Sequence, residues 1–365
     1  MSNLRIPGPT PCPPEVLQAM ARQMINHRGG EFARTLKDVT AKLKVVFQTK
    51  NDVLILTGSG TGGLEAAVVN TLSPGDKVLS VSVGAFGERF AAIAKAFGAE
   101  VTMLQFDWGK AAEPAAIRKA LQADAKIKAV LVTHNETSTG ITNDLAAISA
   151  VVKEFDKLLL VDSISGLGSI KLPVDEWHCD VAISCSQKGW MVPPGLAMVS
   201  VSEAAWRANA SAKMPRFYWD FASAKRYLER GENPWTPAVS VVFGFAVSLD
   251  MMLKEGFPNV VARHARVGKA ARQGIKSLGL SLFADEAHAS DTVTAVAAPK
   301  GLDVKKLLHI LEEEHDIVLA GGQGKLGDTI FRIGHLGLVN ENDIKEVISA
   351  LKVALPKAGF TRVGV

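Results

Sequence analysis

The stretch Val53-Leu54-Ile55-Leu56-Thr57-Gly58-Ser59-Gly60-Thr61-Gly62-Gly63-Leu64 joins an apolar run to a glycine turn and then to a helical pattern. The apolar run predicts a buried strand, and the glycines predict a tight turn at its end. A strand, a glycine turn and a helix start present backbone N–H groups that can bind a phosphate. The stretch therefore predicts an α/β fold with an anion site where a strand ends.

The same alternation continues along the first two thirds of the chain. Helical patterns at 87–97, 113–122 and 145–155 lie between apolar runs, as is typical of parallel βα units. A proline-rich crossing at 231–237 ends the alternation, and helical patterns follow at 239–253 and 260–278. The seven predicted strands of a mainly parallel sheet are 53–57, 77–82, 100–104, 129–133, 158–162, 180–184 and 196–201.

The length of 365 residues predicts more than one domain. We expect an N-terminal segment at 1–20, a large domain at 21–250 and a small C-terminal domain at 251–365. The small domain is expected to be α+β. Its predicted strands are 292–298 and 329–334, and its predicted helices are 304–314 and 341–354.

Two polar residues follow other predicted strands. Lys188 lies in Ser184-Cys185-Ser186-Gln187-Lys188-Gly189-Trp190, and Asp162 ends an apolar run. An amine can hold the aldehyde of pyridoxal phosphate (PLP) as a Schiff base, and a carboxylate keeps its ring nitrogen protonated. The carboxyl ends of parallel strands meet at one edge of a sheet. A glycine turn, an aspartate or a lysine after a strand is common by itself. The three features in this order predict a PLP site.

The composition excludes several other classes of protein. With 47% hydrophobic and 21% charged residues the chain is globular, and its net charge of +4 without a dense basic run argues against nucleic acid. No apolar run reaches the roughly 18 residues that span a membrane. The start lacks a signal-peptide core, so we expect a cytoplasmic protein. Three separate cysteines and scattered histidines indicate no metal site.

With these residues considered together, the chain resembles class V of the fold-type I PLP enzymes. Within that class it is similar to the alanine–glyoxylate and serine–glyoxylate aminotransferases, over nearly its whole length. The motifs that carry the resemblance are Pro7-Gly8-Pro9-Thr10, Gly58-Ser59-Gly60-Thr61 with Leu64-Glu65-Ala66, Thr133-His134-Asn135-Glu136-Thr137-Ser138-Thr139-Gly140, Val161-Asp162-Ser163, Ser186-Gln187-Lys188 with Pro193-Pro194-Gly195, and Phe331-Arg332-Ile333-Gly334.

The resemblance implies a role for each matching position. Lys188 matches the lysine that binds the cofactor and moves the proton, and Asp162 matches the partner of the ring nitrogen. Arg332 matches the residue that binds the substrate carboxylate, a bidentate task suited to guanidinium. The other cofactor-binding positions are Ser59, Gly60, Thr61, Phe86 (stacked on the ring), Thr137, Gln187 and Thr236, the last reaching in from the neighbouring subunit of a homodimer. The other substrate-binding positions are Gly8, Arg28 and Asn233.

Two segments depart from the alanine–glyoxylate pattern. Asn233 stands where those enzymes resemble one another in carrying tyrosine, so a hydroxyl that reaches across the dimer is absent. His27-Arg28 is closer to the corresponding segments of serine–glyoxylate, aspartate and phosphoserine aminotransferases. The sequence leaves open whether Arg28 admits an acidic substrate or only binds the dimer partner.

The resemblance implies a ping-pong aminotransferase that moves an amino group from alanine or serine to glyoxylate or a similar 2-oxo acid. An aspartate aminotransferase of the same class is the alternative. A PLP lyase of the cysteine desulfurase type is less favoured, because Gln187 precedes the lysine and no cysteine follows Cys185. A non-catalytic PLP-fold protein is a further alternative, and the intact set of Lys188, Asp162 and Arg332 argues against it.

Overall fold

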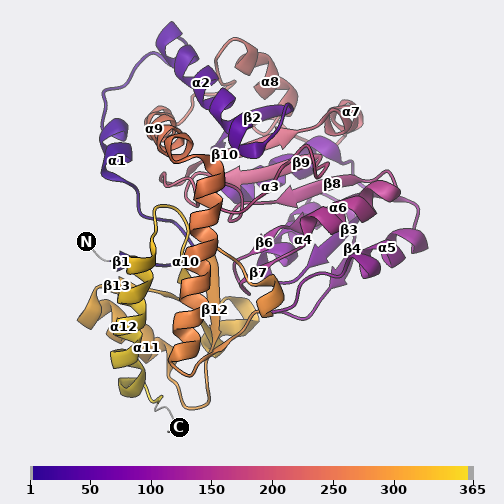
Figure 1. The fold of residues 1–365 in the computed structure, drawn as a ribbon. Helices are drawn as coiled ribbons and strands as arrows, with labels where there is room; N and C mark the ends of the chain where they lie inside the picture. The colour runs from indigo at the N-terminus through magenta and orange to yellow at the C-terminus, as the bar shows by residue number, and fades with distance from the viewer. Residues whose placement is uncertain (1–2, 361–365) are drawn as a thin grey trace.

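A seven-stranded sheet forms the centre of the larger part of the computed structural model, which describes residues 3–360 (Figure 1). The strand order is β2-β10-β9-β8-β5-β3-β4, and within this sheet β10 alone runs antiparallel to its neighbours. The strands are β2 (Asp52–Gly58), β3 (Lys77–Ser82), β4 (Glu100–Gln105), β5 (Ile127–Thr133), β8 (Leu158–Asp162), β9 (Val181–Cys185) and β10 (Gly195–Val201). All seven predicted strands are confirmed, within two residues at each end.

Helices cover both faces of this sheet because its strands are apolar on both sides. In β2, Val53 and Ile55 belong to one buried cluster, whereas Leu54 and Leu56 belong to another, as the two-residue period of a strand requires. The first cluster includes side chains of α2 (Gly30–Phe47), α5 (Pro114–Ala123), α6 (Leu145–Glu154) and α9 (Val239–Glu255). The second includes side chains of α3 (Gly60–Thr71), α4 (Ala85–Ala96), α7 (Glu203–Ser211) and α8 (Phe221–Glu229).

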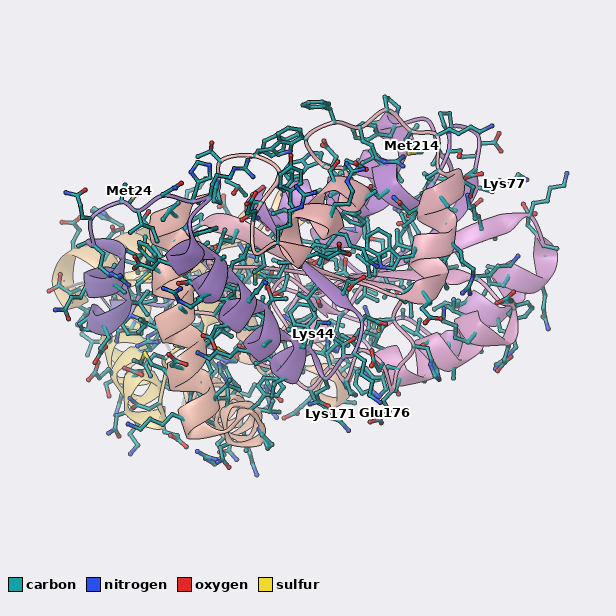
Figure 2. All side chains as sticks on the ribbon, turned by 90° about the horizontal axis from the view of Figure 1, so that it is seen from above. Met24, Lys44, Lys77, Lys171, Glu176 and Met214 are labelled. Carbon is teal, nitrogen blue, oxygen red and sulfur yellow. The ribbon has the colours of Figure 1, made fainter. Side chains whose placement is uncertain are left out.

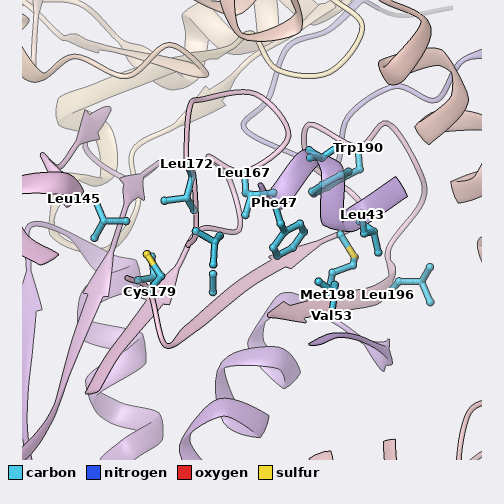
Figure 3. Close-up of a cluster of buried hydrophobic side chains, with 14 of the residues drawn as sticks. Leu43, Phe47, Val53, Leu145, Leu167, Leu172, Cys179, Trp190, Leu196 and Met198 are labelled. Atoms are coloured by element: carbon cyan, nitrogen blue, oxygen red, sulfur yellow. The ribbon is translucent and has the colours of Figure 1, made fainter. Parts of the chain in front are cut away.

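The first cluster also anchors the loop that carries Lys188 (Figure 3). Trp190 is fully buried; its ring stacks on Phe47 at 6.0 Å and meets Phe245 edge-on at 5.6 Å. Its indole N–H donates to Ser184 Oγ at 2.8 Å. A buried aromatic with a satisfied N–H holds this loop firmly at the end of β9.

The C-terminal part is a second, smaller α+β unit. Its antiparallel sheet has the order β11-β12-β15-β14. α10, long and steep in Figure 1, follows α9 after Gly256 and leads into this unit. The elements are α10 (Phe257–Ser277), β11 (Ser281–Leu282), η1 (Glu286–His288), β12 (Val293–Ala297), α11 (Val304–His315), β13 (Ile317–Val318), β14 (Ala320–Gly321), η2 (Gly324–Thr329), β15 (Ile330–Gly334) and α12 (Glu341–Lys357). The predicted small unit is confirmed, and its short strands β11, β13 and β14 were not predicted.

The N-terminal segment joins the two parts. β1 (Asn3–Leu4) pairs with β13, and Thr10 N–H donates to Gln187 O at 3.1 Å beside the lysine loop. The remaining elements are α1 (Pro14–Met20), β6 (Asn135–Glu136) and β7 (Ile141–Thr142). The predicted domain boundary at 250–251 falls inside α9, and the boundaries stay a prediction.

Charged side chains are spread over the outside of the molecule. Figure 2 shows Lys77 and Lys171 at well-separated places. Lys77 pairs with Asp124 at 2.8 Å, and Lys171 lies 5.9 Å from the centre of the Trp177 ring. Over residues 3–360, no helix combines the length and apolar character needed to cross a membrane.

Candidate active site

A cavity of about 390 Å³ opens where β2, β8 and β9 end, against the C-terminal unit. Nine of the predicted site residues line it: Gly8, Ser59, Gly60, Thr61, Phe86, Thr137, Gln187, Lys188 and Arg332. They come from the N-terminal segment, from segments that follow strands of the large sheet, and from β15. Residues up to 324 positions apart in sequence (332 − 8) therefore surround one cavity.

The glycine turn after β2 leads directly into α3. Ser59 is the N-cap of this helix, and its Oγ accepts the N–H of Gly62 at 3.4 Å. Glycine at position 60 leaves room for Ile164, because a Cβ there would lie 2.5 Å from Ile164 Cδ1 and displace that side chain. The first N–H groups of a helix have no intrahelical acceptor, and the helix dipole favours an anion at that end. This corner of the cavity is therefore suited to a phosphate.

Lys188 extends from the loop after β9 into the cavity. Its backbone carbonyl accepts hydrogen bonds from Thr10 Oγ1 at 2.9 Å and from the N–H of Met191 at 3.0 Å. Its Nζ donates to the Pro7 carbonyl. Gly8 has φ +109°, and a Cβ there would lie 2.6 Å from the lysine Nζ. The positive φ and the close approach of the lysine side chain both favour glycine at this position of the N-terminal motif.

The electrostatic surroundings of Lys188 favour its neutral form. Burial lowers the pKa of this amine, the charges of Arg332 and Arg89 lower it further, and Cys185 and Asp162 oppose the shift. A neutral amine is the form that can act as a nucleophile or accept a proton. The lysine is therefore suited to both tasks that the sequence assigned to it.

Asp162 ends β8 and is 3% exposed; it does not line the cavity itself, but its charge interacts with that of Lys188, which does. Within the described chain its carboxylate accepts one hydrogen bond, from the N–H of Ile164 at 3.0 Å. Burial raises the pKa of this carboxyl to about 7, and the nearby charge of Glu136 adds to the rise, while Lys188 and Arg89 lower it. A cation placed beside Asp162, such as a protonated ring nitrogen, would restore its charged form.

Arg332 reaches the cavity from β15 of the C-terminal unit. The residue is 8% exposed, its Nε donates to Gly321 O at 2.9 Å, and one terminal nitrogen donates to Thr137 O at 3.0 Å. Burial lowers the pKa of the guanidinium, and Glu136 raises it. Two carbonyls hold the group in place without neutralising it, so it can still bind a carboxylate.

The observed residues fit PLP. Gly60 leaves a cradle that a Cβ would fill, and the buried Oε1 of Gln187 has no hydrogen-bond partner within the described residues. Such an atom indicates a group that a ligand would complete, with the amide oxygen and nitrogen interchangeable at this position. Ser59, Gly60, Thr61 and Gln187 would hold the phosphate, Lys188 the aldehyde carbon and Asp162 the ring nitrogen.

Three predicted residues lie away from this cavity in the same chain: Arg28, Asn233 and Thr236. Arg28 pairs with Glu232 at 2.6 Å and donates to Asn233 O at 3.0 Å. Asn233 Nδ2 donates to Ile55 O at 2.9 Å, and Thr236 is exposed. Arg28 and Asn233 thus contact each other beside the middle of β2, and the roles assigned to all three residues stay predictions that require a second subunit.

Sequence reasoning missed several residues of the cavity. Arg89 lines it, and its guanidinium lies 4.7 Å from the centre of the Phe86 ring. Its position three residues after Phe86, at the start of a helix, could have placed both on one face. Gln323, Ile164 and Ala320 also line the cavity, and no local pattern marked them.

Comparisons with known proteins agree with this geometry. The model of the family described as Aminotransferase class-V matches residues 3–327. The chain is 45% identical to a soluble hydrogenase 42 kDa subunit of Anabaena cylindrica over 98% of this chain and 94% of that protein. It is 36% identical to a serine–glyoxylate aminotransferase of Methylorubrum extorquens and 37% identical to an L-aspartate–glyoxylate aminotransferase of Paracoccus denitrificans. Each of these two matches covers 97% of this chain and 91% of the relative.

A solved structure extends the agreement to the whole fold. An alanine–glyoxylate aminotransferase from Nostoc sp. superposes with a TM-score of 0.93, at 30% identity, over 97% of this chain and 95% of that one. The chain belongs to the class V aminotransferases. The predicted family, fold class and PLP dependence are thereby confirmed.

Proposed function

We propose that this class V aminotransferase moves an amino group from alanine or serine to glyoxylate or a similar 2-oxo acid, in two half-reactions at one site. The observation that carries the proposal is a cavity lined by Lys188 and Arg332, with the buried carboxylate of Asp162 close enough to Lys188 for their charges to interact. Relatives named for serine and for aspartate with glyoxylate, and a structural neighbour named for alanine with glyoxylate, support the substrate class.

Each of the three residues has a distinct task in this chemistry. PLP, when bound, supplies the aldehyde that takes up the amino group and a ring that accepts the electron pair of the α-carbon. Lys188 Nζ would remove the proton from the substrate α-carbon and deliver it to the cofactor carbon that carried the aldehyde. The Asp162 carboxylate keeps the ring nitrogen protonated. Arg332 holds the substrate carboxylate, so that the α-carbon lies near Lys188.

A substrate with one carboxylate needs a single guanidinium to bind it, and Arg332 is the one held in a fixed position. Arg332 is the guanidinium fixed by two carbonyls, and it suffices for the carboxylate of alanine, serine or glyoxylate. A second carboxylate left unpaired in a closed site would cost roughly several kcal/mol. The preferred donor is therefore small and neutral.

Aspartate is the second candidate donor, and Arg89 is the observation that favours it. This guanidinium lines the cavity and forms no salt bridge within residues 3–360. Arg89 is thus a second cation near the site that could bind the additional carboxylate of an acidic substrate, the role that the sequence analysis considered for Arg28. A relative named for aspartate and glyoxylate supports the same candidate.

The test is a panel of alanine, serine and aspartate crossed with glyoxylate, pyruvate, oxaloacetate and 2-oxoglutarate. We expect alanine or serine with glyoxylate to give the highest kcat/KM. Arg89→Gln and Arg28→Gln should leave the ratio of alanine to aspartate within about threefold of wild type. A wild-type preference for aspartate that collapses in Arg89→Gln or Arg28→Gln would establish the acidic donor instead. Failure of every donor would favour a non-catalytic protein.

We also propose a homodimer with shared active sites. None of Arg28, Asn233 and Thr236 lines the cavity of its own chain, which supports a role against a partner subunit. Mixing Lys188→Ala with Thr236→Ala subunits should give heterodimers with one intact site and one doubly altered site. A fully active monomer in sedimentation would contradict the arrangement.

For its location we propose the cytoplasm, with neither membrane nor nucleic acid as a partner. Cys12, Cys179 and Cys185 are all free thiols in the structure, as expected in a reducing compartment. Cell fractionation tests this directly, because recovery in the membrane fraction would contradict it.

A further inference from the structure

Glu136 is a fully buried carboxylate with no role assigned from the sequence. It lies in β6 and accepts four hydrogen bonds. One oxygen accepts the N–H groups of Phe86 at 3.0 Å and Gly87 at 3.1 Å. The other accepts the N–H of Ser138 at 3.1 Å and its hydroxyl at 2.6 Å. Both oxygens are thus committed to donors within the protein.

Two of these donors belong to the first turn of α4, which carries Phe86 into the cavity. The N-cap of α4 is Gly84, which makes no side-chain capping bond. A Cβ on Gly84 would lie 2.5 Å from Glu136 Cδ. Glu136 therefore replaces the missing cap from a distant segment, and a carboxylate at a helix N-terminus is favoured by the helix dipole.

The hairpin of Glu136 is also fixed on its other side. Asn135 Nδ2 donates to Ser165 Oγ at 2.8 Å and to Thr292 Oγ1 at 2.9 Å, which joins the hairpin to both units. The Thr137 carbonyl accepts from Arg332 at 3.0 Å. Three consecutive residues of one hairpin thus have three tasks. Asn135 joins the two units, Glu136 binds the start of α4, and Thr137 binds Arg332.

We propose that Glu136 is a positioning residue that sets Phe86 over the cofactor ring, and that it acts through Phe86 without touching cofactor or substrate. The inference rests on the proposed placement of the ring against Phe86. Glu136→Gln keeps the shape of the side chain but puts an NH₂ group where backbone N–H groups or Ser138 donate. The start of α4 would shift, and PLP would bind more weakly.

The direction in which PLP affinity changes in Glu136→Gln distinguishes a positioning role from a purely electrostatic effect of the lost charge. PLP is an anion, so the removal of a nearby negative charge would by itself strengthen its binding. Loss of the position of Phe86 would weaken binding by roughly tenfold or more, the scale of a lost charge-assisted hydrogen bond.

The experiment measures the dissociation constant of PLP from the cofactor-free protein for wild type, Phe86→Leu, Glu136→Gln and the double variant. Each single variant should weaken binding, and the double variant should match Phe86→Leu within about twofold. Ser138→Ala removes the hydroxyl that donates to Glu136 and accepts the N–H of Ala85 at the start of α4, while the carboxylate remains. This variant should lose less PLP affinity than Glu136→Gln, and it should lose none in the Phe86→Leu background. If Glu136→Gln does not fold, Ser138→Ala provides the test.

Asp180→Asn is the matched control. Asp180 is also a buried carboxylate that accepts hydrogen bonds from several donors, but it lies at the opposite end of the sheet. Its substitution should lower thermal stability and leave PLP affinity unchanged. Unchanged or tighter PLP binding in Glu136→Gln, or losses that multiply in the double variant, would overturn the proposal for Glu136. An unaffected Phe86→Leu would instead overturn the placement of the ring.

Discussion

A buried aspartate lies at each end of the large sheet, and the two differ in how many partners the protein provides for their carboxylates. At the amino end of β9, Asp180 pairs with Lys153 and accepts the Leu159 N–H at 2.8 Å and the Ser202 hydroxyl at 2.9 Å. At the carboxyl end of β8, Asp162 accepts one N–H, and burial raises its pKa to about 7. The first carboxylate is satisfied by the protein, whereas the second needs a ligand.

The comparison shows how one scaffold separates stability from function. A buried charge with a full set of partners stabilises the fold, and its removal leaves a partner unpaired. A buried charge with few partners costs stability and is retained for what it binds. Substitutions at the two ends should therefore affect different measurements.

The largest expected effect is on kcat, and it comes from substituting the lysine at the carboxyl end of the sheet and not the one at the amino end. Lys188→Ala should lower kcat by at least about 10⁴-fold, because it removes both the nucleophile and the proton carrier. Lys153→Ala should leave kcat within about threefold and lower the free energy of unfolding by roughly 2 kcal/mol, since it leaves Asp180 unpaired. Borohydride reduction and peptide mapping provide the direct check, and reduced cofactor on any other lysine would refute the role of Lys188.

The aspartates should show a similar but smaller separation. Asp162→Asn should lower kcat/KM by roughly 10²- to 10³-fold, because a neutral amide cannot stabilise a protonated ring nitrogen. It should leave the unfolding free energy of the cofactor-free protein equal or higher. Asp180→Asn should lower that free energy by roughly 3 kcal/mol with little change in kcat/KM. Equal losses of stability in both variants would remove the distinction between the two ends.

The smallest effect is a difference in how stability depends on pH. The folded pKa of Asp162 is raised to about 7, so this group binds a proton in the folded state at pH values where the unfolded chain has lost it. Its destabilising contribution is absent below the unfolded pKa of about 4, grows as pH rises to 7, and is constant above that.

Thermal melting of cofactor-free wild type and Asp162→Asn across this range measures the contribution. The variant should gain stability relative to wild type between about pH 4 and 7, with a constant difference at higher pH. Saturation with PLP should stabilise wild type more than the variant, because a protonated ring pairs with the carboxylate. A difference that does not change with pH would contradict the raised pKa.

Local patterns predicted much of the fold and the centre of the site. Each apolar run before a turn became a strand, and the residues after β2, β8 and β9 lie at one edge because those strands run in the same direction. Lys188, Asp162 and the glycine turn could be combined for this reason. The antiparallel direction of β10 could not be predicted in this way, because a short apolar strand reads alike in both directions.

The sequence missed residues whose roles depend on contacts distant along the chain. Glu136 caps a helix that begins 51 residues earlier (136 − 85), with no capping residue beside that helix to mark it. Arg89 is an ordinary helical arginine until the cavity around it is closed. Local spacing gives no sign of the contact between Glu136 and α4, and for Arg89 it indicates only a helix face shared with Phe86.

By itself the sequence determined the βα repeats, the anion-binding turn, and the amine and carboxylate that point to PLP chemistry. It did so because strand period, glycine turns and side-chain chemistry are local properties. Only the tertiary structure decided that Arg332 donates to Thr137 at the cavity, that Gly8 makes room for Lys188, and that Arg28 pairs with Glu232 outside the cavity of its own chain. These relations arise when segments far apart in sequence pack against one another, since burial and distance then set which charges meet.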